Sequence, residues 1–248
     1  MNAPLAAVRI LDVEVHDLTR AELMARLDRG VVVTPNVDIV MQAARDPAFA
    51  ALLNRADYRI CDSQIVLYAA RFLGTPIREK ISGADLLGEY CLHHAANPAV
   101  RVFLLGAGPG IAAEAGRRIN ARAGRDVVVG AHSPSFGFDA DPAECGDVVR
   151  RIAASGATVL AVGLGAPRQE RWIMAHRDQL PGVRLFMAVG ATLDFEAGAV
   201  ARAPAWMRRA GLEWAWRLGQ EPGRLWRRYL VDDLPFFWQL LRQKLGRR

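Results

Sequence analysis

The fold class is decided by one stretch of 14 residues, Val159-Leu160-Ala161-Val162-Gly163-Leu164-Gly165-Ala166-Pro167-Arg168-Gln169-Glu170-Arg171-Trp172. Its apolar beginning does not alternate with polar residues, which is typical of a strand buried on both faces of a parallel sheet. Two glycines then break the run. Pro167 is tolerated in the first turn of a helix, and Glu170 would favour the positive end of the helix dipole. We therefore predict a strand, a glycine turn and a helix.

In an open α/β sheet, the crevice at the carboxyl ends of the strands binds ligands, and a helix N-terminus there favours anions. We expect the polar side chains of Arg168 and Gln169 to lie outside the core. The alternative interpretation is an ordinary strand–turn–helix whose polar residues are only solvated.

Short apolar runs and helical segments alternate along the chain around this stretch. We expect strands at residues 31–33, 58–61, 102–105, 127–129, 159–162 and 185–189, with helices at 39–56, 65–73, 83–96, 111–123, 141–154 and 167–180. Residues 8–15 predict an edge strand or hairpin, followed by a short helix that Thr19 caps. This order predicts an α/β fold with a Rossmann-like, mostly parallel sheet covered by helices on both faces.

The composition is that of a globular protein, with 52% apolar and 23% charged residues. No run of 18 uncharged apolar residues occurs, so we expect no membrane-spanning helix, and the first residues lack the apolar core of a signal peptide. The three cysteines, Cys61, Cys91 and Cys145, are scattered without paired spacing. They indicate reduced thiols in a cytoplasmic protein rather than a disulfide or zinc framework.

The charge is concentrated at the C-terminal end. Residues 1–200 hold 21 Lys/Arg and 22 Asp/Glu, whereas residues 201–248 hold 11 and 4, together with five of the six tryptophans. We therefore predict an α/β catalytic domain over residues 1–198 and a helical, basic and aromatic appendage over residues 199–248. Such a segment could bind a membrane surface, pack within the protein or an oligomer, or bind nucleic acid. The apolar run at residues 235–241, followed by basic residues, favours an anionic membrane over nucleic acid.

Two motifs are ambiguous by themselves. Gly106-x-Gly108-x-Gly110 lacks the third glycine of a dinucleotide-binding fingerprint, and no acidic residue closes the next strand, so nicotinamide binding is disfavoured. Close backbone approach to a nucleotide diphosphate remains compatible with these glycines. Asp139-Ala140-Asp141 resembles a D-x-D metal motif, but Asp141-Pro142-Ala143-Glu144 is typical of a helix start, with a cap and an N1 proline. We favour the cap.

Polar residues follow three of the expected strands. Thr34 and Asn36 end the first, Asp62 ends the second, and Gly163, Gly165 and Gln169 follow the strand at 159–162. Because parallel strands place their carboxyl ends at one sheet edge, we expect these groups to converge. The alternative for Asp62 is the capping of the following helix.

Several strings carry a specific resemblance that covers roughly residues 31–230. They are Thr34-Pro35-Asn36, Cys61-Asp62, Ser82-Gly83-Ala84-Asp85-Leu86-Leu87, Gly163-x-Gly165-x-Pro167-Arg168-Gln169-Glu170, Val189-Gly190-Ala191-Thr192-Leu193-Asp194-Phe195, Arg202-Ala203-Pro204, Gly211-Leu212-Glu213-Trp214 and Glu221-Pro222-x-Arg224-Leu225-x-Arg227-Arg228-Tyr229. Together they resemble the WecG/TagA/CpsF family, glycosyltransferase family 26.

The resemblance implies an inverting glycosyltransferase that moves a hexose from a UDP-sugar to a polyprenyl-diphosphate-linked sugar in bacterial cell-surface polysaccharide synthesis. The donor sugar is left open among N-acetylmannosamine, its uronic acid and glucose. The resemblance also implies metal independence and no cofactor. The alternative function is a membrane-tethered nucleotide-binding protein without transferase activity.

The resemblance further implies roles for individual residues. The family's base falls on Asp62 and its other catalytic positions on Thr34 and Asn36. Candidate substrate-binding residues are Gln169, Lys80, Asp194, Gly106, Gly108, Gly163, Gly165, Arg202, Arg224 and Arg227.

Two positions depart from the family's pattern. Lys80 stands where the family has an arginine, which keeps the charge and loses bidentate binding. Ser63-Gln64 replaces the family's usual residues after the aspartate.

The expected partners are the UDP-sugar, the lipid-linked acceptor and, through the C-terminal segment, an anionic membrane surface. No nucleic acid partner is expected, and the sequence leaves room for a homo-oligomer. The expected location is cytoplasmic, peripheral on the inner face of the cell membrane.

Overall fold

The computed structural model describes residues 5–246, apart from the side chain of Arg224. The chain forms two compact units. The first comprises Met1–Leu23, Thr34–Ser82 and Arg202–Arg248, and the second comprises Met24–Val33 and Gly83–Ala201. The C-terminal segment from Arg202 belongs to the same unit as residues 34–82, and the boundary at residues 198–199 stays a prediction from composition.

The second unit is built on a parallel sheet. Its strands are β3 (Gly30–Val33), β5 (Val102–Gly106), β6 (Val128–His132), β7 (Val159–Gly163) and β8 (Leu185–Ala188), and they lie in the order β3-β8-β7-β5-β6. The strands β5, β7 and β8 are buried along their whole length. This burial explains why their sequences are continuous apolar runs rather than alternating ones.

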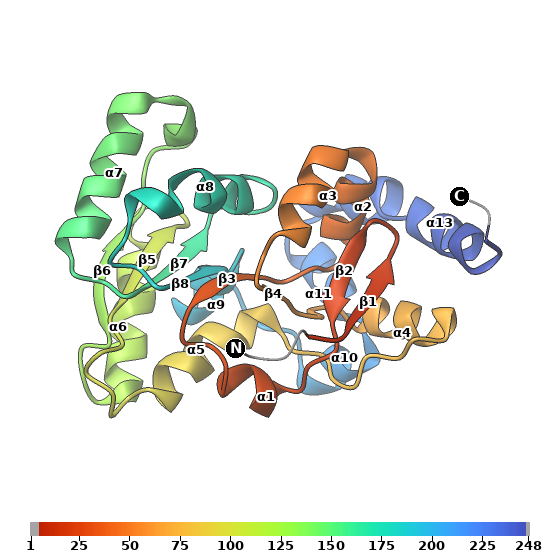
Figure 1. Ribbon diagram of the computed structural model, residues 1–248, viewed down its shortest axis with the longest axis horizontal. Coiled ribbons are helices and arrows are strands. Elements are labelled where there is room, and N and C mark those ends of the chain that lie inside the picture. Colours follow the sequence, from red (N-terminus) through yellow and green to blue (C-terminus); the bar gives the residue numbers. More distant parts are fainter. Residues whose placement is uncertain (1–4, 247–248) are drawn as a thin grey trace. The chain divides into compact units, whose positions relative to one another are not determined.

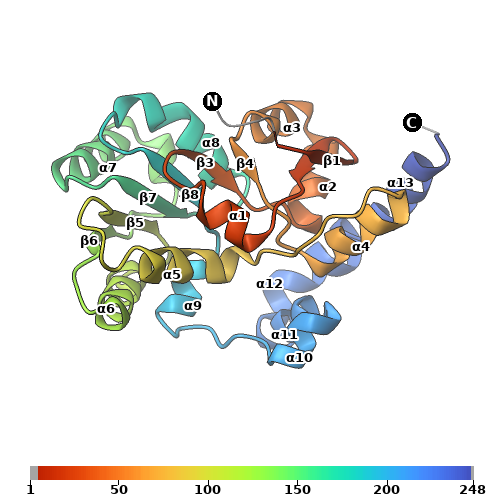
Figure 2. The ribbon, with the colours of Figure 1, turned by 60° about the horizontal axis from the view of Figure 1, so that its bottom comes forward.

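Helices cover both faces of this sheet. The helices α7 (Pro142–Ala154) and α8 (Arg168–His176) lie on one face, and α5 (Gly83–His93), α6 (Ile111–Ala123) and α9 (Thr192–Glu196) lie on the other (Figures 1 and 2). The short turns η1 (Phe138–Ala140) and η2 (Arg177–Gln179) complete the unit. The predicted α/β class, with a parallel sheet between two helical layers, is confirmed.

The first unit begins with an antiparallel hairpin of β1 (Ala7–Ile10) and β2 (Val13–His16), as predicted. The helix α1 (Arg20–Met24) follows, and the Thr19 hydroxyl accepts from the backbone N–H of Glu22 at 3.3 Å, which confirms the predicted cap. The unit continues with α2 (Val37–Arg45), α3 (Pro47–Asn54), the two-residue strand β4 (Tyr58–Arg59) and α4 (Gln64–Leu73). Asp46 ends α2 and caps α3, where Pro47 restarts the helix.

The C-terminal segment is helical over most of residues 205–244 and packs within the first unit. Its helices are α10 (Ala205–Ala210), α11 (Glu213–Gln220), α12 (Pro222–Arg227), the π-helical η3 (Arg228–Asp232) and α13 (Pro235–Lys244). The helix α13 lies beside α4 (Figure 2). Leu225, Phe236 and Leu240 are buried, so this segment has one apolar side that faces the rest of its unit.

Several element bounds differ from those expected, among them the end of β6 and the start of α8. The strand β6 extends to His132, beyond the expected residue 129, because its pairing with β5 shifts register and continues through Gly130. A Cβ at Gly130 would lie 2.7 Å from the ring of Phe103, so the glycine makes room for that ring. Pro167 occupies the N-cap position of α8, one residue before the first turn.

Candidate active site

The first unit brings together the polar residues that follow two strands. The backbone N–H of Asp62 donates to the carbonyl of Pro35 at 3.3 Å, which places Asp62 beside the segment that holds Thr34 and Asn36. The backbone N–H of Ile81 donates to the carbonyl of Cys61 at 2.8 Å, so Lys80 lies next to the same strand end. The segment of Thr34 and Asn36, the segment of Asp62, and Lys80 therefore lie side by side within the first unit.

The cap of α4 separates the two interpretations of Asp62. Ser63, and not Asp62, is the N-cap residue: its hydroxyl accepts from the backbone N–H of Ile65 at 3.2 Å. Asp62 is half-buried and precedes the helix. The interpretation of Asp62 as the helix cap is therefore wrong. Ser63, which departs from the family's usual residue after the aspartate, serves as the cap of α4.

Thr34 and Asn36 differ in their surroundings. Thr34 is buried, whereas Asn36 is half-buried and caps α2, accepting from the backbone N–H of Ile39 through its side-chain oxygen at 3.1 Å. A capping asparagine keeps its NH₂ group for other partners, because only its oxygen is used by the helix. Capping also fixes the side-chain orientation of Asn36 at the strand end.

Of the predicted cations in the first unit, Lys80 contacts the C-terminal segment, to which Arg202 and Arg227 themselves belong. Lys80 Nζ donates to the carbonyl of Arg208 at 3.4 Å, and Arg202 pairs with Glu213 at 3.7 Å between Nε and Oε1. Arg227 is exposed at the end of α12. The prediction for Arg224 concerns a side chain outside the described part of the structure.

In the second unit, the carboxyl ends of β5 and β7 meet at two glycines. Gly106 and Gly163 are register partners, and the backbone N–H of Ala107 donates to the carbonyl of Gly163 at 3.0 Å. A Cβ at Gly106 would lie 2.4 Å from the Gly163 carbonyl oxygen, and φ at Gly106 is +117°. Both glycines are buried, and the close approach of the two strands requires glycine at Gly106 because a side chain there would meet the Gly163 carbonyl.

The side chain of Gln169 joins α8 to the end of β8. Its Oε1 accepts from the backbone N–H of Gly190 at 3.0 Å, and its Nε2 donates to Glu170 Oε1 at 2.8 Å. Gln169 and Glu170 are only 2% and 1% exposed, respectively. The expectation that Gln169 lies outside the core is therefore wrong: its polar groups are satisfied internally, which permits burial. This arrangement holds the turn after β8 against the first turn of α8.

The remaining predicted residues of the second unit lie in turns or in α9. Gly108 is exposed and accepts from the backbone N–H of Ile111 at 3.1 Å. Gly165 is exposed with φ at +77°, and its carbonyl accepts from the backbone N–H of Gln169 at 3.0 Å. Asp194 is half-buried in α9. The structure thus places Gly106, Gly163 and Gln169 together around three strand ends.

The D-x-D motif is used for structural contacts. Asp141 caps α7, and its Oδ1 accepts from the backbone N–H groups of Ala143 at 2.9 Å and Glu144 at 3.3 Å. Asp139 binds Arg168 through an ion pair with Nη2 and Oδ1 2.5 Å apart. The favoured cap interpretation is confirmed. Among residues 5–246, no three His, Cys, Asp or Glu side chains form a group suited to a metal ion.

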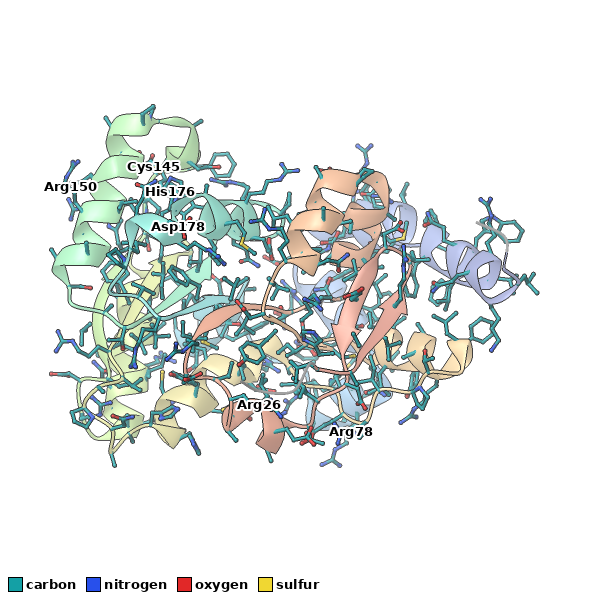
Figure 3. The ribbon with its side chains drawn as sticks, in the orientation of Figure 1. Arg26, Arg78, Cys145, Arg150, His176 and Asp178 are labelled. Atoms are coloured by element: carbon teal, nitrogen blue, oxygen red, sulfur yellow. The ribbon has the colours of Figure 1, made fainter. Side chains whose placement is uncertain are left out.

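A cysteine–histidine contact lies elsewhere in the second unit, between α7 and α8. Cys145 and His176 lie close together (Figure 3), with Cys145 Sγ 3.3 Å from His176 Nε2. Trp172 Nε1 donates to the same sulfur at 3.4 Å. The Trp172 carbonyl accepts from His176 Nδ1 at 2.9 Å, which leaves Nε2 as the acceptor for the thiol. These contacts pack the two helices together. All three cysteines are free and buried, as the scattered spacing predicts.

Sequence reasoning missed two carboxylates that contact the C-terminal segment. Asp38, in the first turn of α2, pairs with Arg228 at 2.8 Å. Asp233 is only 8% exposed, and its burial, reinforced by the negative charge of Asp38, raises its pKa to about 7. The available signal was weak: Asp233 is one of only four acidic residues in the basic segment 201–248.

The comparisons with known proteins agree with the resemblance. The chain matches the glycosyl transferase WecG/TagA/CpsF family over residues 8–248. It is 30% identical over 241 residues to an N-acetylglucosaminyldiphosphoundecaprenol N-acetyl-beta-D-mannosaminyltransferase of Staphylococcus aureus strain MW2, covering 94% of this chain and 91% of the relative. It is 33% identical over 199 residues to the enzyme of the same name from Bacillus spizizenii strain W23, covering 80% and 74%.

Proposed function

The chain belongs to the WecG/TagA/CpsF family of glycosyltransferases, and from that premise we propose that it transfers N-acetylmannosamine with inversion. The donor is the UDP-sugar, and the acceptor is N-acetylglucosamine carried on a polyprenyl diphosphate, in cell-surface polysaccharide synthesis. The names of the relatives from Staphylococcus and Bacillus support this choice among the three sugars that the sequence leaves open.

One observation carries the assignment of the base: the helix after Asp62 is capped by Ser63, so capping does not account for the aspartate. In the proposed reaction the acceptor hydroxyl oxygen attacks the anomeric carbon, and the bond from that carbon to the UDP oxygen breaks. The Asp62 carboxylate takes the hydroxyl proton, because a hydroxyl group is a poor nucleophile until a positioned base removes its proton. Thr34 and Asn36, beside Asp62, would orient the reacting groups.

The leaving diphosphate gains negative charge and needs donors or cations. Within the first unit, we propose that Lys80 and the arginines of the C-terminal segment, Arg202, Arg224 and Arg227, supply these cations. The second unit, considered by itself, has exposed backbone at Gly108 and Gly165 and a helix N-terminus at α8 that favours anions. We assign Gln169 to holding the turn after β8, and Asp194 to the sugar.

We further propose that the protein acts at the inner face of the cell membrane, docked through its C-terminal segment. None of the helices in residues 5–246 is long and apolar enough to span a bilayer. The segment nevertheless exposes large apolar side chains: Trp206, Trp226, Leu230, Val231, Leu234, Phe237, Trp238, Leu241 and Leu245. Exposed aromatics beside Lys and Arg suit the interface of an anionic membrane, where a lipid-linked acceptor would be found.

The test is UDP release by the purified protein with the lipid-linked acceptor, across UDP-N-acetylmannosamine, its uronic acid and UDP-glucose. We expect acceptor-dependent release with the first donor. Asp62→Asn should lower kcat by about 10²–10⁴-fold with nearly unchanged affinity for UDP.

Ser63→Ala is the matched control at the next position. It removes the cap and should cost about 1 kcal/mol of stability while leaving kcat within about twofold. Near-normal turnover of Asp62→Asn would remove Asp62 from the mechanism. UDP binding without any release would favour the nucleotide-binding protein without transferase activity.

A further inference from the structure

An ion pair within the first unit joins the start of α2 to the C-terminal segment. Arg228 Nη2 lies 2.8 Å from Asp38 Oδ2, with 32% and 13% of the two side chains exposed, respectively. The same carboxylate oxygen accepts from Gln42 Nε2 at 2.7 Å. Asp38 stands in the first turn of α2, two residues after the capping Asn36. It is therefore fixed on the same short segment as the proposed catalytic residues.

Further contacts surround this pair. Arg45, at the end of α2, donates to the backbone carbonyl of Asp232, so both ends of the helix bind η3. The carboxylate of Asp233 is buried nearby, where Asp38, Asp232, Arg45 and Arg228 all act on its charge. The ring of Tyr229 lies 5.6 Å from the Arg228 guanidinium. η3 is thus held at its start by Arg228 and at its end by the Asp232 carbonyl, through directional polar contacts as well as by packing.

Stability alone is a weak reason for such a pair. Desolvation of two charges offsets most of their attraction, so well-packed apolar residues can serve stability equally well. Burial indeed acts against the charged form of Asp38 and raises its pKa, although Arg228 opposes that shift. What an ion pair does provide is a defined position for its two partners, because guanidinium and carboxylate bind in a fixed geometry.

The segment that this pair fixes contains the proposed substrate-binding arginines. Arg227 directly precedes Arg228, and Arg224 stands one turn earlier in α12. We propose that Asp38 is a positioning residue: by binding Arg228 it sets the junction of α12 and η3, and with it the placement of Arg224 and Arg227. This inference rests on the proposed function of those arginines, and it adds a residue to which the sequence motifs gave no role.

A double-mutant cycle tests this inference. Asp38→Ala, Arg228→Ala and the double variant are compared in kcat and in KM for each substrate. If Asp38 acts through Arg228, each single variant should lower kcat about 10-fold or more, and the double variant should be no worse than the poorer single one. Asp38→Glu, which keeps the charge, should restore part of the loss. Asp147→Ala breaks an exposed ion pair with Arg151 within α7, and this control should change none of these values.

A second readout does not depend on turnover. Amide hydrogen exchange over residues 222–233 should become faster in Asp38→Ala and Asp38→Asn, with the rest of the chain and the overall fold kept. Unchanged exchange, or kcat losses that multiply in the double variant, would overturn the positioning role. A wild-type protein that transfers no sugar would overturn the proposed function instead, and exchange over 222–233 would still decide the role of Asp38.

Discussion

Arg168 and Asp139 bind each other through two contacts, with Nη2 to Oδ1 at 2.5 Å and Nε to Oδ2 at 3.4 Å. Asp139 is the first acid of the D-x-D sequence, and Arg168 is the first residue of α8. The pair ties η1 to the turn after β7 and holds the pKa of Asp139 below its ordinary value, chiefly through the hydrogen bond from Arg168. A motif that could suggest metal-dependent transfer therefore has another function in this chain.

The first prediction concerns metal. Because Asp139 binds Arg168 and Asp141 caps α7, we expect transfer to survive excess EDTA. Asp139→Asn should cost at most about 1 kcal/mol of stability, as is usual for an ion pair about one-third exposed on each side. The measurement is UDP release with and without chelator. Loss of activity that Mg²⁺ or Mn²⁺ restores would revive the metal interpretation.

The second prediction concerns the glycine contact between β5 and β7. In Gly106→Ala, the new methyl group would lie 2.4 Å from the Gly163 carbonyl oxygen, at a φ of +117°. Since a backbone atom cannot move aside as a flexible side chain can, we expect a loss of several kcal/mol in the free energy of unfolding. Urea titration measures this loss.

Gly146→Ala provides the control in the same unit. Gly146 lies in α7, and the nearest atom to its added methyl group would be the guanidinium tip of Arg150, 3.4 Å away. That flexible tip can move, and alanine favours the helix by up to about 1 kcal/mol. Equal stabilities of the two alanine variants would show that the sheet edge adapts to a side chain at Gly106.

The third prediction concerns pH. The folded-state pKa of Asp233 is about 7, raised from 3.8 by burial and by the charge of Asp38. Between these values the unfolded chain releases the proton while the folded chain retains it, so the stability that Asp233 contributes is lost as pH rises from about 4 to 7. Asp233→Asn stays neutral. Relative to the wild type, it should gain a few kcal/mol of stability between pH 4 and 8, at about 1.4 kcal/mol per pKa unit.

Urea unfolding of the wild type and Asp233→Asn at several pH values measures this gain. In the Asp38→Asn background the gain should be smaller, because the repulsion that helps to raise the pKa of Asp233 is removed. A stability difference that is the same at pH 5 and pH 8 would contradict an elevated pKa at Asp233.

The parts of the fold that the sequence predicts are those set by local patterns. The apolar runs of β5 and β7 predict buried strands, and Asp141-Pro142 predicts the start of α7, because both signals lie within a few residues. At the candidate site, local reasoning placed Asp62 at a strand end but left its capping role open. The structure shows that Ser63 caps α4, and this contact could not be assigned from the sequence alone.

The contacts that sequence reasoning missed join residues far apart in the chain. Gln169 is buried because Gly190 and Glu170 satisfy its amide, and nothing in the run around Gln169 indicates the position of Gly190. The pair of Asp38 and Arg228 has the same character. A polar side chain can be buried when a partner distant in the sequence satisfies its hydrogen bonds. Composition and periodicity describe only local sequence, so they do not predict such a partner.

The last prediction concerns membrane docking by α13. Phe237 and Trp238 are 56% and 63% exposed on this helix, whereas Phe236 and Leu240 are buried and hold it to the unit. Removing the whole segment would therefore uncover apolar core, so a point variant is the sharper test. Phe237→Ser with Trp238→Ser should weaken binding to anionic vesicles at least 10-fold, because two aromatic anchors are lost while the buried side is kept.

Vesicle cosedimentation measures this binding, and its salt dependence separates the two forces. Arg242 and Lys244 in the last turn of α13 should each contribute about 1 kcal/mol at an anionic surface, and that contribution should fall as salt is added. The aromatic contribution should persist at high salt. Leu92→Ser, an exposed apolar position on α5, serves as the control and should leave binding unchanged. Equal loss in both variants would indicate non-specific adsorption, and no loss in either would exclude α13 as the docking helix.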